Sequence, residues 1–480
     1  MPEIKIIDAV AHSADVRFAE PVNMYLAEGE NLTIIGPNGA GKSLLIDLMM
    51  GKIRCKSGSA RIEDNGQELR FFDLKYISFR DIYRMAGTEG GYYQQKWNAT
   101  ENEESPFVAD PLGRNKIEKA RDIITDLHME EVVEKRLINL SSGELRKMQI
   151  LRALMAYPKL LIIDNPFIGL DAESRLTVST LLRKISETDK TQIILVITNT
   201  KDMPDWIPSV LPVVDMKILP KMTREAFLAD NSLRDRLFPQ NDEVAVVLPE
   251  QEMSDCSDYA NAVLFNRVNV RYYTKQILRE VSWNVQRNEK WALLGKNGCG
   301  KSTLLSLICG DNPQGYANDI TLFDRKRGTG ESIWDIKSHI GYLSPDMHTY
   351  YRENITCEDV VSSGFFDQIG LYRKPNDEQR AMARKWLRTF EAEHIANKPF
   401  LSSSFGEQRL ALLVRAFVKS PSLLILDEPL HGLDESKKRI AKRVVEEYCK
   451  AKNATLIYVT HYEEEIPECV TLKKILVKPE

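Results

Sequence analysis

The chain carries one series of four short motifs twice, in the same order and with nearly the same spacing. The pairs are GPNGAGKS at 36–43 with GKNGCGKS at 295–302, SSGELRK at 141–147 with SFGEQRL at 404–410, LLIIDNPFIGLD at 160–171 with LLILDEPLHGLD at 423–434, and VITN at 196–199 with YVTH at 458–461. Segments of different composition that keep one register, about 260 residues apart, indicate two copies of one domain.

The repeat divides the chain into a first domain at 1–220, a linker at 221–260 and a second domain at 261–480. A length of 480 residues is too great for one core and fits two such domains. We expect a short helical tail near 222–238. Residues 240–260, with six acidic side chains and no basic one, are then expected to form a solvated connection.

Short apolar runs surround the repeated motifs and predict the fold class. NLTIIG at 31–36 and WALLG at 291–295 end in glycine and are each followed by an apolar helical opening. LLIID at 160–164, LLILD at 423–427 and two later runs at 192–198 and 455–460 have the continuous hydrophobicity of buried strands. Strands that alternate with helices predict an α/β domain with a mostly parallel sheet, whose ligands bind outside the carboxyl ends of the strands.

Composition narrows the possible partners and the compartment. The net charge of −4 and the pI near 6.1 argue against a nucleic-acid partner, which usually requires a strongly basic surface. The seven scattered cysteines lack CxxC spacing and are expected to be reduced thiols of a cytoplasmic protein. The N-terminus does not have the pattern of a signal peptide, and no uncharged apolar run reaches about 18 residues. Any membrane-spanning helices would therefore come from another chain.

Each GxxxxGK[ST] loop predicts a phosphate-binding site. Its glycines let backbone N–H groups turn toward phosphate oxygens, and the positive end of the following helix faces the same anion. Lys42 and Lys301 are expected to reach the β- and γ-phosphates of ATP, and the hydroxyls of Ser43 and Ser302 to ligate Mg²⁺. The other residues expected at ATP are Gly36, Asn38, Gly39, Gly41, Gly295, Asn297, Gly298, Gly300 and Thr303.

Carboxylates at the ends of two predicted strands supply the expected chemistry. Asp164 and Asp427 are placed to hold the Mg²⁺ ion, although an aspartate at a strand end can also serve only as a turn residue. Glu428 follows directly and is a candidate to orient or deprotonate the attacking water. The first copy has Asn165 at this position, and an amide can hydrogen-bond a water but cannot accept its proton.

Three further positions carry side chains that could take part in the site. His461 ends an apolar strand and stands in register with Asn199, so we expect it to contact the γ-phosphate rather than serve only in packing. Tyr272 offers an aromatic face on which adenine could stack, with core packing as the alternative and Tyr273 as a substitute. Cys299 lies inside the second loop, where Lys301 and a helix N-terminus predict a reactive thiol, although a small residue that simply fits is the plainer interpretation.

Together the phosphate loops, the LSSGE run at 140–144, the DEP step at 427–429 and the GLD turns resemble the ATP-binding cassette (ABC) family over nearly the whole chain, twice. Residues 318–344 and 406–434 resemble a subgroup of paired-cassette proteins associated with molybdate transport. The resemblance implies two P-loop domains, each with a helical signature subdomain, that pair head to tail. Each ATP would then lie between one phosphate loop and the other domain's signature. The signature residues are Ser141, Ser142, Gly143, Glu144, Ser404, Gly406 and Glu407.

Several positions depart from the family pattern and predict unequal sites. Asn165 and Asn199 in the first copy replace the base and the histidine, and Phe405 replaces a signature glycine in the second. The γ-phosphate-sensing glutamine corresponds to Gln95 in the first copy, with Gln94 as the alternative, and to Pro345 in the second. We therefore expect one competent ATP-hydrolysing site, formed around Glu428 and His461.

Three functions fit these residues. In the first, the chain is an ATPase that energises transport through separate membrane permease subunits, with molybdate or a related oxyanion as cargo and a place on the cytoplasmic face of the membrane. In the second, a soluble ATPase remodels a macromolecular partner, although the short acidic connection is unlike the charged helical linkers of such proteins. In the third, the chain is a nucleotide-gated scaffold with little turnover, which Glu428 and His461 argue against and Pro345 favours.

Overall fold

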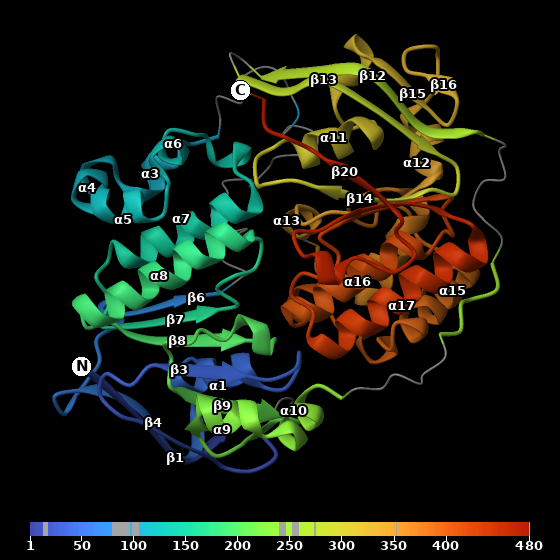
Figure 1. The fold of residues 1–480 in the computed structure, drawn as a ribbon. Helices are drawn as coiled ribbons and strands as arrows, with labels where there is room; N and C mark the ends of the chain where they lie inside the picture. Colours follow the sequence, from blue (N-terminus) through green and yellow to red (C-terminus); the bar gives the residue numbers. More distant parts are fainter. Residues whose placement is uncertain are drawn as a thin grey trace. The chain divides into compact units, whose positions relative to one another are not determined.

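The fold is described from a computed structural model covering residues 1–12, 18–78, 97, 105–239, 246–251, 259–272, 275–351 and 353–479. The chain separates into two compact units. The first comprises 1–87, 106–242 and 432–436, and the second comprises 88–105, 243–431 and 437–480. Each unit is described by itself below, and Figure 1 shows the elements of both.

The first unit contains a parallel sheet and a smaller antiparallel sheet. The parallel strands follow the order β6-β7-β8-β3-β9, with β10 and β11 added antiparallel to β9. The strands are β1 (Pro2–Ala11), β2 (Val22–Leu26), β3 (Leu32–Ile35), β4 (Cys55–Asp64), β5 (Gln67–Glu68), β6 (Leu74–Ile77), β7 (Leu160–Asp164), β8 (Gln192–Ile197), β9 (Ser209–Val214), β10 (Lys217–Ile218) and β11 (Met222–Thr223). The helices are α1 (Lys42–Met49), α3 (Ala109–Leu112), α4 (Arg114–Ile117), α5 (Arg121–Asp126), α6 (Glu130–Val133), α7 (Ser142–Leu154), α8 (Ala172–Thr188), α9 (Arg224–Ala229) and α10 (Asn231–Leu237).

The parallel sheet separates two hydrophobic cores, as the alternation of side chains along a strand requires. Along β7, Leu161 and Ile163 pack with α7 and α8 on one face, whereas Leu160 and Ile162 pack with α1 and the strands β1 and β2 on the other. Figure 1 shows α8 lying across β6, β7 and β8. Within the predicted linker, Phe227 of α9 and other apolar side chains of α9 and α10 pack into the first of these cores.

The second unit repeats this plan with different lengths. Its parallel sheet has the order β17-β18-β19-β14-β20, which matches β6-β7-β8-β3-β9 strand for strand, and its antiparallel sheet has the order β13-β12-β15-β16. The strands are β12 (Asn261–Tyr272), β13 (Lys275–Gln286), β14 (Lys290–Leu294), β15 (Asp319–Leu322), β16 (Arg325–Lys326), β17 (Ile340–Leu343), β18 (Leu423–Asp427), β19 (Thr455–Val459) and β20 (Leu472–Ile475). The helices are α11 (Lys301–Ile308), α12 (Ile333–Ser338), α13 (Met347–Tyr350), α14 (Cys357–Ser362), α15 (Asp377–Thr389), α16 (Phe405–Phe417) and α17 (Glu435–Lys452).

In this unit α11 lies between the antiparallel strands β12 and β13 and the parallel strand β14 (Figure 1). One core joins these elements, and Leu423 and Ile425 of β18 reach it from the parallel sheet. The predicted α/β fold with a mostly parallel sheet in each half is therefore confirmed. Among the described residues, no helix is both long enough and apolar enough to cross a bilayer.

Candidate active site

Both phosphate loops connect the carboxyl end of a central parallel strand to a helix. The first follows β3 and leads into α1, and the second follows β14 and leads into α11. Gly41 and Gly300 precede these helices with φ of 104° and 98°, a left-handed conformation that side chains disfavour. A Cβ atom on Gly36 would lie 2.0 Å from the carbonyl oxygen of Val213, so this loop start also requires glycine.

The two loop lysines are held in nearly the same way. Lys42 donates from Nζ to the carbonyl oxygens of Gly36 and Pro37, both at 2.7 Å. Lys301 donates to the carbonyl oxygen of Gly295 at 2.7 Å and to that of Lys296 at 3.1 Å. Burial lowers the pKa of Lys42 to about 8, against the opposing influence of the nearby Asp164 carboxylate. Each loop is thus curled around its own lysine.

The remaining loop residues have the arrangement that a phosphate site needs. A Cβ atom on Gly39 or Gly298 would meet no other atom within 4 Å, so the backbone there borders open space. Ser43 and Ser302 are exposed at the first turn of their helices, whereas Thr303 is buried. Asn38 and Asn297 lie within the two loops.

Asp164 and Asp427 are the last residues of β7 and β18, as the apolar runs predict. Asp164 lies close enough to Lys42 to oppose the lowering of its pKa. Its Oδ1 accepts a hydrogen bond of 2.9 Å from the side-chain amide of Asn165. Asp427 is buried, with 5% of its surface exposed.

Glu428 takes the first position after β18 and turns sharply out of the sheet. Its φ is 50° and its amide donates to the carbonyl oxygen of Val459 at 2.9 Å. The side chain is buried, and neither carboxylate oxygen accepts a hydrogen bond from a described residue. Burial raises the pKa of Glu428 well above its ordinary value, and the neighbouring charges of Asp427 and Glu465 raise it further.

Two histidines approach this carboxylate from different segments. His461, which follows β19, has Nε2 3.1 Å from Oε1 of Glu428. His431, three residues after Glu428, has Nε2 3.1 Å from Oε2. Both contacts are close, but neither carboxylate oxygen accepts a hydrogen bond from a described residue. His461 was expected from the sequence but His431 was not, because its only signal was a titratable residue inside the DEP–GLD segment.

The corresponding corner of the first unit has the same backbone and different chemistry. Asn165 has φ of 48°, and its backbone N–H donates to the carbonyl oxygen of Val196 at 2.7 Å, just as the backbone N–H of Glu428 donates to that of Val459. Its side chain is engaged by Asp164 and by the hydroxyl of Thr198, which donates to Asn165 Oδ1 at 3.3 Å. Asn199 accepts a hydrogen bond from the backbone N–H of Lys201, as the cap of a short 3₁₀ turn. At the position equivalent to Glu428, the first unit therefore has no carboxylate that could accept a proton.

The signature runs form the N-termini of α7 and α16. Ser141 and Glu144 make a reciprocal capping box at α7, and Ser404 and Glu407 make the same box at α16. Burial alone would raise the pKa of Glu144, but the ion pair with Lys135 at 2.5 Å outweighs it and holds the pKa below its ordinary value. These caps leave the first backbone N–H groups of each helix, including those near Ser142, Gly143 and Gly406, at a positive helix end.

The departure at Phe405 is accommodated inside the second unit. Its ring stacks on the imidazole of His348, with centroids 4.9 Å apart and planes 26° apart. The altered signature is therefore a packed aromatic feature of the helix start and not a loose insertion.

A buried arginine on each signature helix ties that helix to the strand-end acid, and the sequence analysis missed both. Arg409 is 1% exposed and donates to the backbone carbonyl oxygens of Ser344, Asp427 and Glu428 at 3.1, 2.9 and 2.6 Å. Arg146 is fully buried and donates to the carbonyl oxygens of Asp164, Asn165 and Pro166. The available signal was the recurrence of arginine five residues after the signature serine in both copies.

Other predicted residues have mixed outcomes. Tyr272 packs against the core of the second unit, and its hydroxyl accepts a hydrogen bond of 3.0 Å from Asn312. Burial raises the pKa of this phenol to about 12. Its contact with adenine stays a prediction. Tyr273, Gln94 and Gln95 lie outside the described residues.

The prediction of a reactive Cys299 is wrong. The side chain is 2% exposed, and burial raises the pKa of the thiol more than the nearby Lys301 lowers it. A Cβ atom on Gly295 would lie 2.6 Å from Cys299 Sγ, so the residue fills space behind the loop. The plainer interpretation, a small residue that fits, holds.

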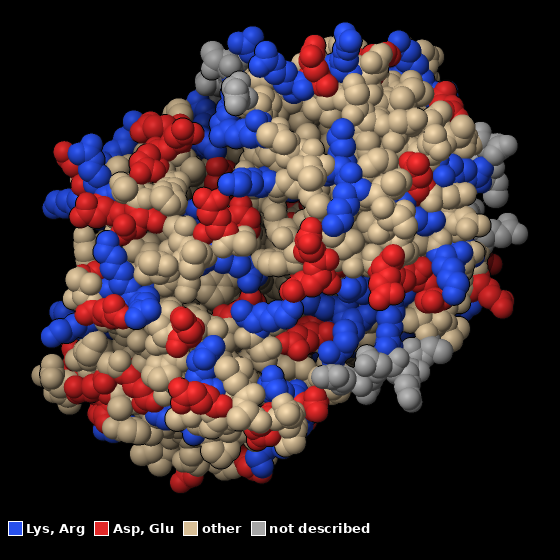
Figure 2. All heavy atoms as spheres, viewed as in Figure 1, with Lys and Arg blue, Asp and Glu red and all other residues tan. Residues whose placement is uncertain are grey.

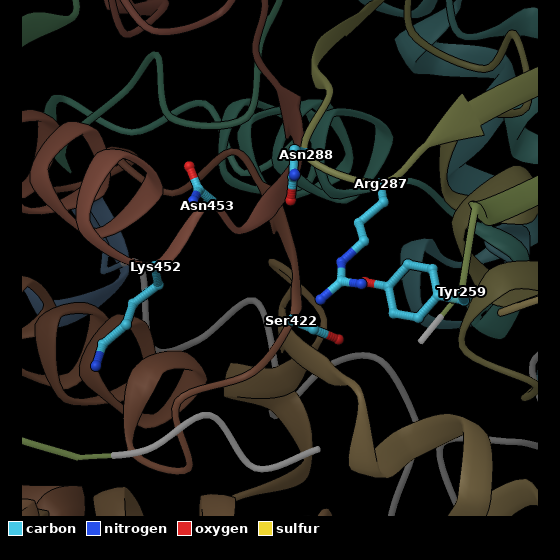
Figure 3. Close-up of a pocket in the computed structure, with 6 residues that line it drawn as sticks. All are labelled: Tyr259, Arg287, Asn288, Ser422, Lys452 and Asn453. Atoms are coloured by element: carbon cyan, nitrogen blue, oxygen red, sulfur yellow. The ribbon is translucent and has the colours of Figure 1, made fainter. Parts of the chain in front are cut away.

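The second unit also has a small polar cavity of about 230 Å³, away from these residues. It is lined by Tyr259, Arg287, Asn288, Ser422, Lys452 and Asn453, as Figure 3 shows. Asn288, Ser422 and Asn453 each lie just before a parallel strand, at β14, β18 and β19. The cavity is therefore at the amino edge of the sheet, whereas the phosphate loop and Glu428 are at the carboxyl edge.

Comparison with known proteins identifies the family of the chain. The family model described as ABC transporter matches residues 19–168 and again 278–431. The ABC transporter ATP-binding protein ModF of Escherichia coli is 33% identical and covers 98% of this chain and 96% of its own length. An uncharacterized ABC transporter ATP-binding protein of Schizosaccharomyces pombe is 28% identical and covers 95% of this chain and 94% of its own.

Solved structures share the fold at low identity. A model of ribosome-bound archaeal Pelota and ABCE1 matches with a TM-score of 0.59 and 14% identity, over 98% of this chain and 76% of that one. A crystal structure of archaeal ribosomal stalk protein aP1 with the recycling factor aABCE1 matches with a TM-score of 0.53 and 17% identity, over 98% of this chain and 87% of that one. With the family model matched once in each half and a full-length relative above 30% identity, the chain belongs to the ABC transporter family and carries two of its ATPase domains.

Proposed function

We propose that this tandem ABC protein hydrolyses ATP at a site built on the second unit and retains ATP at a site built on the first. In this proposal, Lys301 and the backbone of its loop bind the β- and γ-phosphates. Glu428 takes the proton of the attacking water, and His461 contacts the γ-phosphate. Tyr272 and, in the first copy, Gln95 remain candidate contacts to the nucleotide.

The observation that carries the proposal is the state of the Glu428 carboxylate. It is buried, its pKa is raised, and its two oxygens accept no hydrogen bond from the described residues. Unsatisfied buried polar atoms are rare in proteins and usually have a reason. A water molecule held for attack would satisfy these oxygens, and a raised pKa makes the carboxylate a better proton acceptor.

The donor atoms near each loop fit Mg²⁺, because hydroxyl and carboxylate oxygens are the ligands this hard ion prefers. Ser302 with Asp427, and Ser43 with Asp164, would hold it; both serines are exposed at the helix start. When bound, the ion supplies positive charge against the phosphate oxygens.

The first unit is proposed to bind ATP without turnover. It keeps the loop, Lys42 and Asp164, but Asn165 cannot accept a proton and its amide is already bonded to Asp164 and Thr198. General acid–base assistance contributes about 10²–10⁴-fold in rate, so its absence should nearly silence this site. The head-to-tail pairing of the two cassettes is part of the proposal and rests on the family resemblance.

Replacement of Glu428 tests the proposal. Glu428→Gln should lower single-turnover hydrolysis at least a hundredfold and leave ATP binding intact, because only the proton acceptor is lost. Asn165→Gln is the matched control in the other copy and should leave the rate within about twofold. If Glu428→Gln keeps half the activity or more, the site is misassigned.

We further propose that hydrolysis energises transport of an oxyanion such as molybdate through separate membrane permease subunits. The likeness to ModF over nearly the full chain supports this role. Figure 2 shows that basic and acidic side chains of the described residues are interspersed on the surface it displays. Affinity purification in parallel from detergent-solubilised membranes and from cytosol tests the role. Specific recovery of a permease would support the transport role. Specific recovery of ribosomes or nucleic acid would instead indicate that the protein remodels a macromolecular partner.

A further inference from the structure

We infer that His431 is a positioning residue for the Glu428 carboxylate and so sets the rate of hydrolysis without contacting the nucleotide. The inference rests on the proposed function of the second unit, because it concerns how its base is oriented. The carrying observation is a juxtaposition of one buried carboxylate with two imidazoles, one of which the proposed reaction does not use.

The two imidazoles approach different oxygens of Glu428. Nε2 of His461 lies 3.1 Å from Oε1, and Nε2 of His431 lies 3.1 Å from Oε2. The three side chains are almost completely enclosed, with exposed fractions of 9%, 10% and 7% for His461, His431 and Glu428. His461 reaches the carboxylate from the end of β19, and His431 reaches it from the turn after β18. The carboxylate therefore has an imidazole beside each oxygen.

The backbone at Glu428 is fixed, but its side chain is not fixed by hydrogen bonds. Arg409 and the carbonyl oxygen of Val459 hold the main chain of the residue. Beyond Cα, the carboxylate oxygens accept no hydrogen bond from a described residue. A base must lie within hydrogen-bond reach of the proton it takes, and a displacement of about 1 Å can cost about a hundredfold in rate. The imidazole of His431, 3.1 Å from Oε2, restricts the movement of the carboxylate on that side.

The internal repeat supplies an independent argument. The first copy has Asn165, Ile168 and Asn199 at the positions of Glu428, His431 and His461. Ile168 has no polar atom in its side chain, and Asn165 is held by other partners. The lysine, the metal aspartate and the buried arginine are the same in both copies. His431 thus goes with the catalytic pair and not with the scaffold that both copies share.

The turn itself does not need a histidine. The backbone N–H of His431 donates to the carbonyl oxygen of Glu428 at 3.2 Å, and that of Ile168 donates to the carbonyl oxygen of Asn165 at 3.3 Å. Either side chain is compatible with this turn, so substitution at 431 should leave the local backbone in place.

The test compares two amides of different reach. His431→Gln keeps a polar side chain that reaches about as far as Nε2, whereas His431→Asn keeps the polarity but is too short to contact Glu428; His431→Leu removes the polar group altogether. We expect kcat to fall about tenfold or more in His431→Asn and His431→Leu, with KM for ATP within about twofold of the parent. His431→Gln should recover kcat to within about threefold. Ile168→Leu, the matched change in the first copy, should leave kcat unchanged.

The outcomes separate the inference from the function on which it rests. Glu428→Gln is measured alongside, and retention of half the activity or more would overturn the proposed function itself. If Glu428→Gln is inactive but His431→Asn keeps the parental kcat, or if Gln and Asn are equally impaired, His431 does not position the base. Binding of a fluorescent ATP analogue and the thermal midpoint are measured for each variant. If kcat falls only in variants that also bind the analogue more weakly or have a lower thermal midpoint, the inference is overturned as well.

Discussion

Lys42 and Lys301 occupy the same place in the two copies, and each ammonium already donates to two carbonyl oxygens of its own loop. Binding of a triphosphate would turn these charges toward phosphate oxygens. Because the two lysines have nearly the same local geometry, any difference between their contributions to ATP binding and hydrolysis should come from the other residues of each site.

The two lysines should differ when replaced. Lys301→Ala should lower ATP hydrolysis a hundredfold or more, because the main fixed positive charge at the reacting phosphates is lost. Lys42→Ala should instead lower the number of ATP molecules bound per chain and leave measurable turnover. Steady-state hydrolysis and equilibrium dialysis measure both effects. Near-normal turnover in Lys301→Ala would show that the reaction occurs elsewhere.

The described cysteines differ in thiol reactivity for physical reasons that the sequence did not reveal. Burial raises the pKa of Cys299, whereas a hydrogen bond from Cys449 lowers the pKa of the half-buried Cys469 against the effect of its own burial. A lower pKa leaves more thiolate at a given pH.

In a Cys256→Ser background, we therefore expect Cys469 to react with a disulfide reagent well before Cys299. The rates are followed at pH 7 to 8 by absorbance and by mass mapping of the labelled peptides. Cys469→Ser should remove the fast phase. A fast phase that instead disappears in Cys299→Ala would mean that the second loop opens readily.

At the scale of elements, each signature helix is joined to its strand end by one buried guanidinium. Arg409 connects α16 to the backbone of residues 427 and 428, and Arg146 makes the equivalent connection from α7. A movement of either signature helix should therefore shift the strand-end residues, because the arginine side chain is hydrogen-bonded to their backbone carbonyl oxygens.

Arg409→Met should be destabilising. It removes the guanidinium donors from three buried carbonyl oxygens, although those of Ser344 and Glu428 keep the backbone N–H groups of Met347 and His431 as donors, and the flexible methionine retains part of the packing. We expect a loss of about 1–3 kcal/mol in the free energy of unfolding of the second unit, measured by urea denaturation with Trp fluorescence. Arg409→Lys, which keeps the charge with fewer donors, should recover part of it. A change below about 0.5 kcal/mol would mean that the interaction contributes little.

Much of each element could be predicted from sequence, because strands such as Leu160–Asp164 and Leu423–Asp427 are unbroken apolar runs and the loops have fixed glycine spacing. Arg409 donates to backbone carbonyl oxygens, so the sequence contains no partner side chain for it, and the recurrence of arginine in both copies does not reveal what it binds. His431 was missed because its partner is recognised only once Glu428 turns out of the sheet. Cys299 was misjudged because the nearby charge is visible in the sequence and burial is not.

At the scale of the whole molecule, two copies of one fold carry different side chains just after the ends of equivalent strands. The second has Glu428, His431 and His461, and the first has Asn165, Ile168 and Asn199. Duplication within one chain lets each copy vary separately, which two identical subunits could not do.

We expect two ATP molecules to bind per chain and about one to be hydrolysed in each cycle. The reason is that the first unit retains its phosphate loop but has Asn165, which cannot accept a proton, at the position of Glu428. Equilibrium dialysis with Glu428→Gln gives the number bound, and quench-flow on the parent preloaded with labelled ATP gives the number hydrolysed in the first turnover. A burst of two per chain would contradict the unequal sites.

The left-handed turn after β7 and β18 has a consequence for the stability of the two copies. A side chain such as glutamate carries roughly 1–2 kcal/mol of backbone strain at φ near 50°, which asparagine partly avoids through its short polar side chain. The first copy, with Asn165 at 48°, is therefore the relaxed version of this turn, and the second, with Glu428, is the strained one. We therefore expect the turn after β7 to cost less backbone strain on folding than the turn after β18.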